Sequence, residues 1–197
     1  MAEILPAFFF GHGNPMNAVM NNGYTEGWRR IGQRRPDPRP SCRFVPGTDV
    51  TISASPRTIH DFGGFPRELY QVQYPAPGDP YLARRVQELL TPVPVALDNS
   101  WGLDHGTWSV LRHVYPDADI PIVRLSIDET QPATFHFAVG RKLTPLRDEG
   151  TLIVGSGNLV HNLHAYAWGR YVPDPYDWAV RFETEAKQIM TAANTNR

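Results

Sequence analysis

The sequence predicts an α/β fold in which helices flank a mostly parallel central sheet. Short apolar runs typical of buried strands alternate along the chain with segments whose apolar residues recur at helical spacing. Glycines and prolines separate these segments and form no low-complexity tract. The 197 residues are enough for one domain with its own core. We therefore expect a single domain over residues 1–193, followed by a tail at 194–197.

Five segments are expected to be strands. Residues 5–10 are apolar and run into a glycine-rich turn, whereas residues 49–53 alternate in the way that is typical of an edge strand. The remaining apolar runs are residues 93–97, 120–127 and 151–154. In residues 34–47, prolines at alternate positions from Pro36 remove backbone donors. We therefore expect no central strand or helix before Ser41.

Four amphipathic segments are expected to be helices, at residues 24–33, 80–90, 132–149 and 178–189. The second has the clearest start, because Asp79 is a capping residue and Pro80 occupies the first turn. The third should end at Gly150. His113 and His136 lie off the apolar stripes, and we expect both to be exposed to solvent.

Composition narrows the class of protein. The 19 basic and 20 acidic residues give a net charge of −1, which offers no electrostatic footprint for nucleic acid or an anionic membrane. The single cysteine, Cys42, excludes an internal disulfide and fits a reducing compartment. Residues 5–10 are too short to span a bilayer and lack the features of a signal peptide. We therefore expect a cytoplasmic protein.

Three histidines, His12, His105 and His161, each follow an expected strand, and His60 lies in a loop of similar composition. Because the carboxyl ends of parallel strands share one edge, these side chains could converge there. Imidazoles suit Fe(II) or Zn(II), and a further imidazole near the metal would be a general acid or base. Taken alone, His12 can also be explained as a turn residue, and His161 as a residue that caps the next helix.

Several common signatures are missing. The chain has no His-Glu-x-x-His helix and no cysteine-rich zinc site. The run from Gly155 to Gly157, which we expect to open a turn after the strand at 151–154, resembles a phosphate-binding loop only weakly because the lysine is absent. Hydrolytic zinc chemistry and nucleotide binding are therefore not indicated by motif.

Five ordered motifs together resemble the 4,5-DOPA extradiol dioxygenase family. They are GHGNPM at 11–16, TIHDFGGFP at 58–66, YPAPG at 74–78, WGLDHGTW at 101–108 and GNLVHN at 157–162. This family belongs to the class III extradiol dioxygenases, which are related to the catalytic subunit of protocatechuate 4,5-dioxygenase. The resemblance implies a non-haem metal enzyme that uses dioxygen to open a catechol ring beside its two hydroxyls.

The resemblance also implies roles for particular residues. His12 and His161 would be metal ligands, with His161 also serving as acid or base, and His105 would face the bound catechol or dioxygen. The substrate would further contact His60, Asp104 and Asn158. The expected cofactor is one Fe(II) or Zn(II) ion per chain, and the expected partners are a catechol and dioxygen, with neither nucleic acid nor membrane.

The chain departs from the family pattern at two places. A family strand ending in Ser-Ala-His-Trp, whose histidine is a ligand, corresponds to residues 41–44, which read Ser-Cys-Arg-Phe. Another ligand histidine of the family lies beyond the position of Arg197. We expect the loss of a central strand to expose sheet edges and favour self-association. The alternatives are therefore an active dioxygenase, an inactive or catechol-binding member that lacks a full metal site, and a metal hydrolase.

Overall fold

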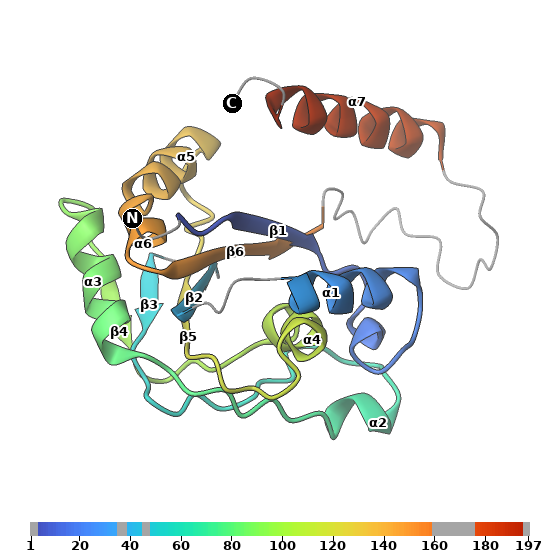
Figure 1. Ribbon diagram of the computed structural model, residues 1–197, viewed down its shortest axis with the longest axis horizontal. Coiled ribbons are helices and arrows are strands. Elements are labelled where there is room, and N and C mark those ends of the chain that lie inside the picture. The colour runs from blue at the N-terminus through green and yellow to red at the C-terminus, as the bar shows by residue number, and fades with distance from the viewer. Residues whose placement is uncertain (1–3, 35–38, 45–47, 159–175, 195–197) are drawn as a thin grey trace. The chain divides into compact units, whose positions relative to one another are not determined.

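The structure is a computed structural model that describes residues 4–34, 39–44, 48–158 and 176–194. It divides into two compact units, residues 1–157 and 158–197, of which the second contains helix α7 (Asp177–Asn194). The first unit has the predicted α/β fold with a mostly parallel sheet (Figure 1). The single domain over residues 1–193 stays a prediction. No helix in the described part of the chain is long and apolar enough to cross a membrane.

Six strands form the sheet in the order β1-β6-β2-β5-β3-β4. Their bounds are Ala7–Gly11 (β1), Arg39–Phe44 (β2), Asp49–Thr51 (β3), Ala96–Asp98 (β4), Ile122–Leu125 (β5) and Thr151–Gly157 (β6). Neighbouring strands are parallel except for β3, which is antiparallel to β5. The carboxyl ends of β1, β6, β2 and β5 therefore share one edge of the sheet.

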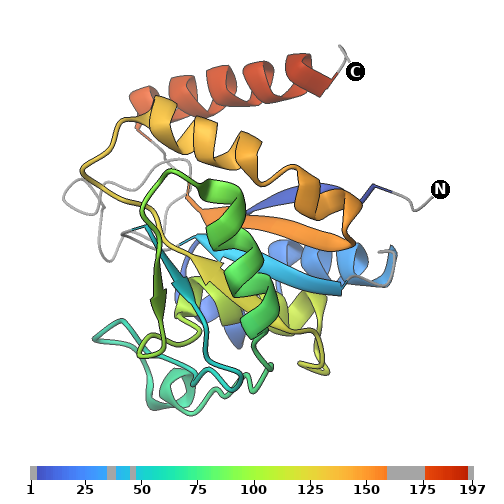
Figure 2. The same cartoon turned by 90° about the vertical axis from the view of Figure 1, so that its left-hand side faces the viewer.

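Helices cover both faces of this sheet (Figures 1 and 2). Helices α1 and α4 pack on one face, and α3, α5 and α6 on the other. The bounds of the helices in the first unit are Pro15–Ala18 (η1), Gly23–Arg34 (α1), Arg67–Tyr70 (α2), Pro80–Leu90 (α3), His105–Val114 (α4), Ala133–Lys142 (α5) and Pro145–Asp148 (α6). Strand β5 contributes to both cores, because Ile122 packs on the α4 side whereas Val123 and Leu125 pack on the α3 side.

The presence of strand β2 shows that two expectations from the sequence were wrong. Residues 39–44 form a central strand between β6 and β5, where the prolines predicted none and where the family resemblance predicted the loss of a strand. The pairing with β6 is irregular between Arg39 and Ser41. Pro40, which has no N–H to donate, falls at this irregularity, where a regular ladder bond is not required. From Ser41 to Phe44 the strand then pairs regularly with β5.

Two further expectations were wrong. Residues 49–51 are not an edge strand, because β3 lies between β5 and β4 and Val50 is fully buried beneath α3. His113 is not exposed, since it lies on α4, is buried, and donates from Nε2 to the carbonyl oxygen of Asn17 at 2.8 Å. Burial lowers the pKa of His113. His136 is half-buried and donates to the carbonyl of Asp128.

Gly102 lies where two backbone segments meet, and a Cβ built there would come within 2.0 Å of the Arg57 carbonyl oxygen. That oxygen accepts a hydrogen bond from the N–H of Leu103 at 2.8 Å, so it cannot easily move away. We expect Gly102→Ala to lower the free energy of unfolding by about 1–3 kcal/mol. A Cβ added to Gly140 in α5 would meet no other atom within 4 Å. Gly140→Ala should therefore raise the free energy of unfolding by about 0.5–1 kcal/mol. Urea denaturation of both variants measures the two changes in the free energy of unfolding. Changes of the same sign in the two variants would contradict the prediction.

Candidate active site

His12 lies at the carboxyl edge of the parallel sheet. It follows Gly11, the last residue of β1, and Gly11 is paired with Gly157 at the end of β6. The backbone N–H of His12 donates to the carbonyl oxygen of Gly157 at 3.2 Å. The predicted position of His12 directly after a strand is therefore confirmed.

The glycines of β6 have a different role from the expected one. The strand does not stop at Val154 to open a turn but continues through Gly157. A Cβ at position 155 would lie 2.8 Å from the ring of Phe9 on the neighbouring strand. Glycine there lets the ring approach the β6 backbone, and the extended strand carries Ser156 to the side chain of His12.

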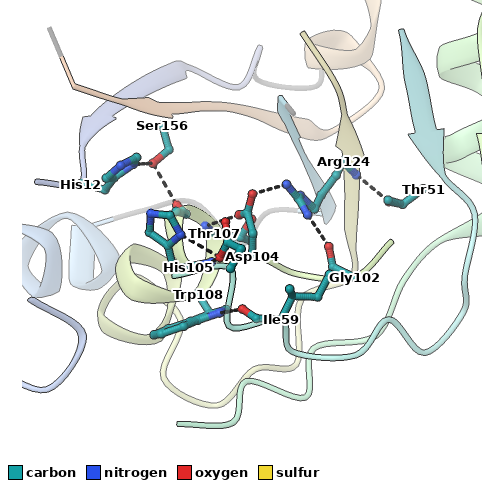
Figure 3. Close-up of polar contacts among 12 residues, drawn as sticks. His12, Thr51, Ile59, Gly102, Asp104, His105, Thr107, Trp108, Arg124 and Ser156 are labelled. Carbon is teal, nitrogen blue, oxygen red and sulfur yellow. Dashed lines mark hydrogen bonds and ion pairs between the residues drawn. The ribbon is translucent and has the colours of Figure 1, made fainter. Parts of the chain in front are cut away.

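Ser156 fixes the protonation of the His12 ring (Figure 3). Its hydroxyl donates to the carbonyl oxygen of Gly106 at 2.9 Å, and a carbonyl can only accept. The Ser156 oxygen must therefore accept from Nδ1–H of His12, which lies 2.9 Å away. A neutral His12 then has its lone pair on Nε2, which is how metal-binding histidines are usually held.

His105 begins helix α4 and meets His12, with 5.5 Å between the ring centroids and the two planes nearly perpendicular. Oδ1 of Asp61 accepts hydrogen bonds from the backbone N–H of His105 at 3.0 Å and from its Nδ1 at 2.8 Å. Burial raises the pKa of Asp61, but the hydrogen bonds and the charge of His105 outweigh it and lower the pKa to about 2. Asp61 is therefore a carboxylate at neutral pH.

His60 lies in an aromatic cluster beside His105. Its Nε2 donates to the carbonyl oxygen of Val72 at 3.0 Å, and its ring contacts Phe62 and Trp108 at centroid distances of 5.9 and 5.5 Å. Phe62 in turn contacts the ring of His105 at 5.7 Å. His60 is therefore separated from His105 by one ring, and its contact with substrate stays a prediction.

Asp104 is held by two structural contacts. One oxygen caps α4 by accepting from the backbone N–H and the hydroxyl of Thr107, at 3.0 and 2.9 Å. The other forms an ion pair with Arg124, whose second terminal nitrogen donates to the Gly102 carbonyl (Figure 3). Burial lowers the pKa of Arg124, and the charge of Asp104 opposes this shift. The predicted contact of Asp104 with substrate stays a prediction.

A cavity of about 340 Å³ adjoins the histidine pair through Asp61. The indole of Trp101 forms part of its wall, and the guanidinium of Arg124 lies 6.0 Å from the centroid of that ring. The lining residues are Asp49, Thr51, Asp61, Asp98, Trp101, Asp104, Arg124 and Ser126. Hydrogen bonds from Ser100 lower the pKa of Asp98. The cavity is therefore strongly acidic around a single buried arginine.

The structure brings together two of the three histidines predicted to converge. His12 and His105 meet, whereas His161 lies outside the described residues. Asn158 directly follows β6 and is half-buried, and it begins the second unit. Within the described part of the chain, no three residues of the types His, Cys, Asp and Glu are grouped so as to hold a metal ion. His12 thus has the orientation of a ligand, but the described residues do not by themselves complete a metal centre.

Two residues of the site were missed in the sequence. Asp61 stands next to His60 in the TIHDFGGFP motif, and Ser156 stands between two glycines at the end of a strand. Polar residues at such places were a usable signal for a pocket. Their partners could not have been identified, because the contacts of Asp61 and Ser156 span 44 and 144 residues of sequence.

Comparison with known proteins identifies the family. Residues 44–196 match the family described as the catalytic LigB subunit of aromatic ring-opening dioxygenase. The chain is 51% identical over 193 residues to the 4,5-DOPA dioxygenase extradiol of Escherichia coli K12, covering 95% of this chain and 71% of that protein. It is 40% identical over 178 residues to the protein of the same name from Beta vulgaris, covering 81% of this chain and 63% of the relative.

A solved structure supports the same assignment. The crystal structure of an uncharacterized protein from Escherichia coli K12 superposes with a TM-score of 0.78 and 46% sequence identity. The superposition covers 93% of this chain and 72% of the other. The family resemblance predicted from the five motifs is confirmed, and the chain belongs to the LigB family of aromatic ring-opening dioxygenases.

Proposed function

We propose that the protein is a metal-dependent extradiol dioxygenase that opens the ring of a catechol such as DOPA with dioxygen. The observation that carries the proposal is the contact of His12 with His105 at the sheet edge, 5.5 Å between ring centroids, beside a cavity. Membership of the LigB family supports the class of reaction, and the names of the relatives from Escherichia coli and Beta vulgaris support DOPA as the catechol.

His12 would bind Fe(II) or Zn(II) through Nε2, because Ser156 holds the proton on Nδ1. On the strength of the GNLVHN motif, we propose His161 as a second ligand that also serves as acid or base. A bound metal supplies Lewis acidity and brings catechol and dioxygen together. His105 would accept the proton of a catechol hydroxyl, as its position against His12 allows.

The cavity would receive the part of the substrate that does not react. Its volume of about 340 Å³ is within the range of small-molecule sites, and Trp101 gives it an aromatic wall. We propose that Asp104, which lines the cavity, contacts the substrate, with His60 and Asn158 as further contacts from the family resemblance. The proposed place of action is the cytoplasm, which the single cysteine supports.

The test is anaerobic reconstitution with Fe(II), or in parallel with Zn(II), followed by dioxygen uptake and product absorbance with DOPA and simple catechols. We expect uptake with formation of a coloured ring-opened product, and we expect His161→Ala to abolish both. Stoichiometric metal is expected in the unmodified chain. Absence of uptake together with absence of bound metal would instead identify an inactive or catechol-binding member, and ester cleavage without dioxygen would identify a hydrolase.

Ser156→Ala should weaken metal binding by about 10- to 100-fold, because the variant loses the hydroxyl that orients the His12 ring and fixes its proton. Competition with a chelator measures the affinity directly and requires no turnover. Ser100→Ala is a matched control, since Ser100 is an exposed serine whose hydroxyl bonds to Asp98 and not to a histidine. Equal affinities of the two variants would remove Ser156 from the proposed site.

A further inference from the structure

We propose that Asp61 is a positioning residue that orients His105 and keeps its proton on Nδ1, so that Nε2 can accept a proton from the substrate. The proposal rests on the proposed function for the role of His105. One oxygen of Asp61 accepts both the backbone N–H of His105 at 3.0 Å and its ring Nδ1 at 2.8 Å. A carboxylate only accepts, so Nδ1 must carry the proton, and the lone pair of a neutral ring lies on Nε2.

The backbone N–H and the ring N–H of His105 both donate to the same oxygen of Asp61, and this holds the imidazole ring in one orientation relative to its own backbone. The ring is further confined by the edge contacts with Phe62 at 5.7 Å and His12 at 5.5 Å. The side chains of His105 and Asp61 are 24% and 26% exposed, so water competes only partly for their hydrogen bond. His105 therefore has a defined orientation before any ligand arrives.

Asp61 is itself held in place by contacts other than its bonds to His105. Its loop is anchored to the start of α4 by a β-bridge between Thr58 and Leu103 and by a bond from the N–H of Ile59 to the Leu103 carbonyl at 2.7 Å. The indole of Trp108 also donates to the Ile59 carbonyl at 2.9 Å (Figure 3). Since these bonds do not involve the Asp61 side chain, its removal should leave the loop in place.

Without Asp61 the ring would lose the acceptor that decides its tautomer, and a proton on Nε2 would block the role of base. In the proposed reaction the proton would move from a catechol hydroxyl oxygen to Nε2 of His105, leaving the substrate with the electron pair. Asp61 would accept no proton. It would act only through His105 by holding the ring and stabilising the charge that the ring gains.

The test is long-range ¹H–¹⁵N correlation spectroscopy of the histidine rings in the full chain, at a pH where they are neutral and with His105→Gln to assign the signal. We expect His105 to carry its proton on Nδ1 in the unmodified protein and on Nε2 in Asp61→Ala. Asp61→Asn should restore the Nδ1 proton, because the backbone N–H of His105 can only donate and so requires the amide oxygen to face it.

Thr107→Val is the matched control, since it removes a hydrogen bond at the same helix start without touching the His105 ring. It should leave the proton on Nδ1. In turnover of DOPA, Asp61→Ala should lower kcat by about 10- to 100-fold and change KM by less than about threefold. Asp61→Asn should recover most of this loss, which a general weakening of the fold would not explain.

The two proposals fail in different ways. A proton on Nε2 in the unmodified chain, or one on Nδ1 in Asp61→Ala, would overturn the role of Asp61 whatever the activity. The first of these does not use Asp61→Ala and so does not depend on whether that variant folds. The expected tautomers without dioxygen uptake in the unmodified chain would leave the orientation of His105 by Asp61 intact and overturn the dioxygenase.

Discussion

Asp104→Asn is expected to lower the free energy of unfolding by about 3 kcal/mol, because it leaves a buried positive charge without its counter-ion. The side chains of Arg124 and Asp104 are 1% and 14% exposed, so solvent screens the pair very little. Asparagine is as good a helix cap as aspartate and could still accept from the N–H of Thr107. The loss of stability would therefore come from removing the charge of Asp104 and not from removing the cap of α4.

The double variant Asp104→Asn with Arg124→Met should recover most of that stability. Arg124 lies in the middle of β5, and within the described residues its Nε is buried without a hydrogen-bond partner. Replacing such a pair by an apolar side chain of similar length is often neutral or stabilising. Urea denaturation of both single variants and of the double variant measures the coupling between the two positions.

An exposed ion pair gives the matched control. Arg85 and Glu149 are 2.7 Å apart and each side chain is 40% exposed, so solvent screens this pair and Glu149→Gln should cost much less stability than Asp104→Asn. If Asp104→Asn cost no more than Glu149→Gln, the buried pair would not be the stabilising contact that its geometry indicates. The single Arg124→Met variant would then also be expected to be nearly neutral.

Helix α3 shows which parts of the fold the sequence could predict. Asp79 was expected to cap it, and its side chain accepts from the N–H groups of Tyr81 and Leu82. Pro80 was expected in the first turn and is there. The signals for this helix all lie within the helix or beside it, so they do not depend on the rest of the chain. Gly150, which has a φ of +82°, follows the end of α6 for the same kind of local reason.

Strand β2 and helix α4 show why other parts could not be predicted. The prolines around Arg39 argue against a strand locally, and only the pairing with β5 and β6 on both sides makes one. The segment from His105 to Val114 begins among glycines and tryptophans that are typical of a loop. It becomes a helix because nearly all of it is buried against the sheet and α1, which is information from distant residues.

The candidate site was predicted for a reason that is only partly correct. His12 lies at the shared carboxyl edge of the parallel strands, as expected. His105 was expected there because it follows the strand at 93–97, but that strand, β4, is parallel to β3 and so runs opposite to β5. His105 reaches His12 through the start of α4 instead, where Asp61 and the loop around Ile59 hold it.

The second large effect is expected for His12→Ala, which should lower turnover of DOPA by at least about 10³-fold and abolish stoichiometric metal binding. The reason is that Ser156 holds the Nδ1 proton of His12 and so leaves the Nε2 lone pair of the neutral ring for the metal, whereas alanine offers no such lone pair. The backbone bond from residue 12 to Gly157 does not involve the imidazole, so the sheet edge should persist.

His136→Ala is the control for His12→Ala, because His136 is a half-buried histidine on α5 that bonds to the Asp128 carbonyl, outside the proposed site. It should retain turnover and metal. Metal content and dioxygen uptake measured on the same samples separate two causes of a loss, since an intact metal site with no uptake would assign His12 to the chemistry and not to ligation. Retention of more than about a tenth of the activity in His12→Ala would be incompatible with either role, because loss of a metal ligand or of a proton-transfer group lowers turnover by far more than about tenfold.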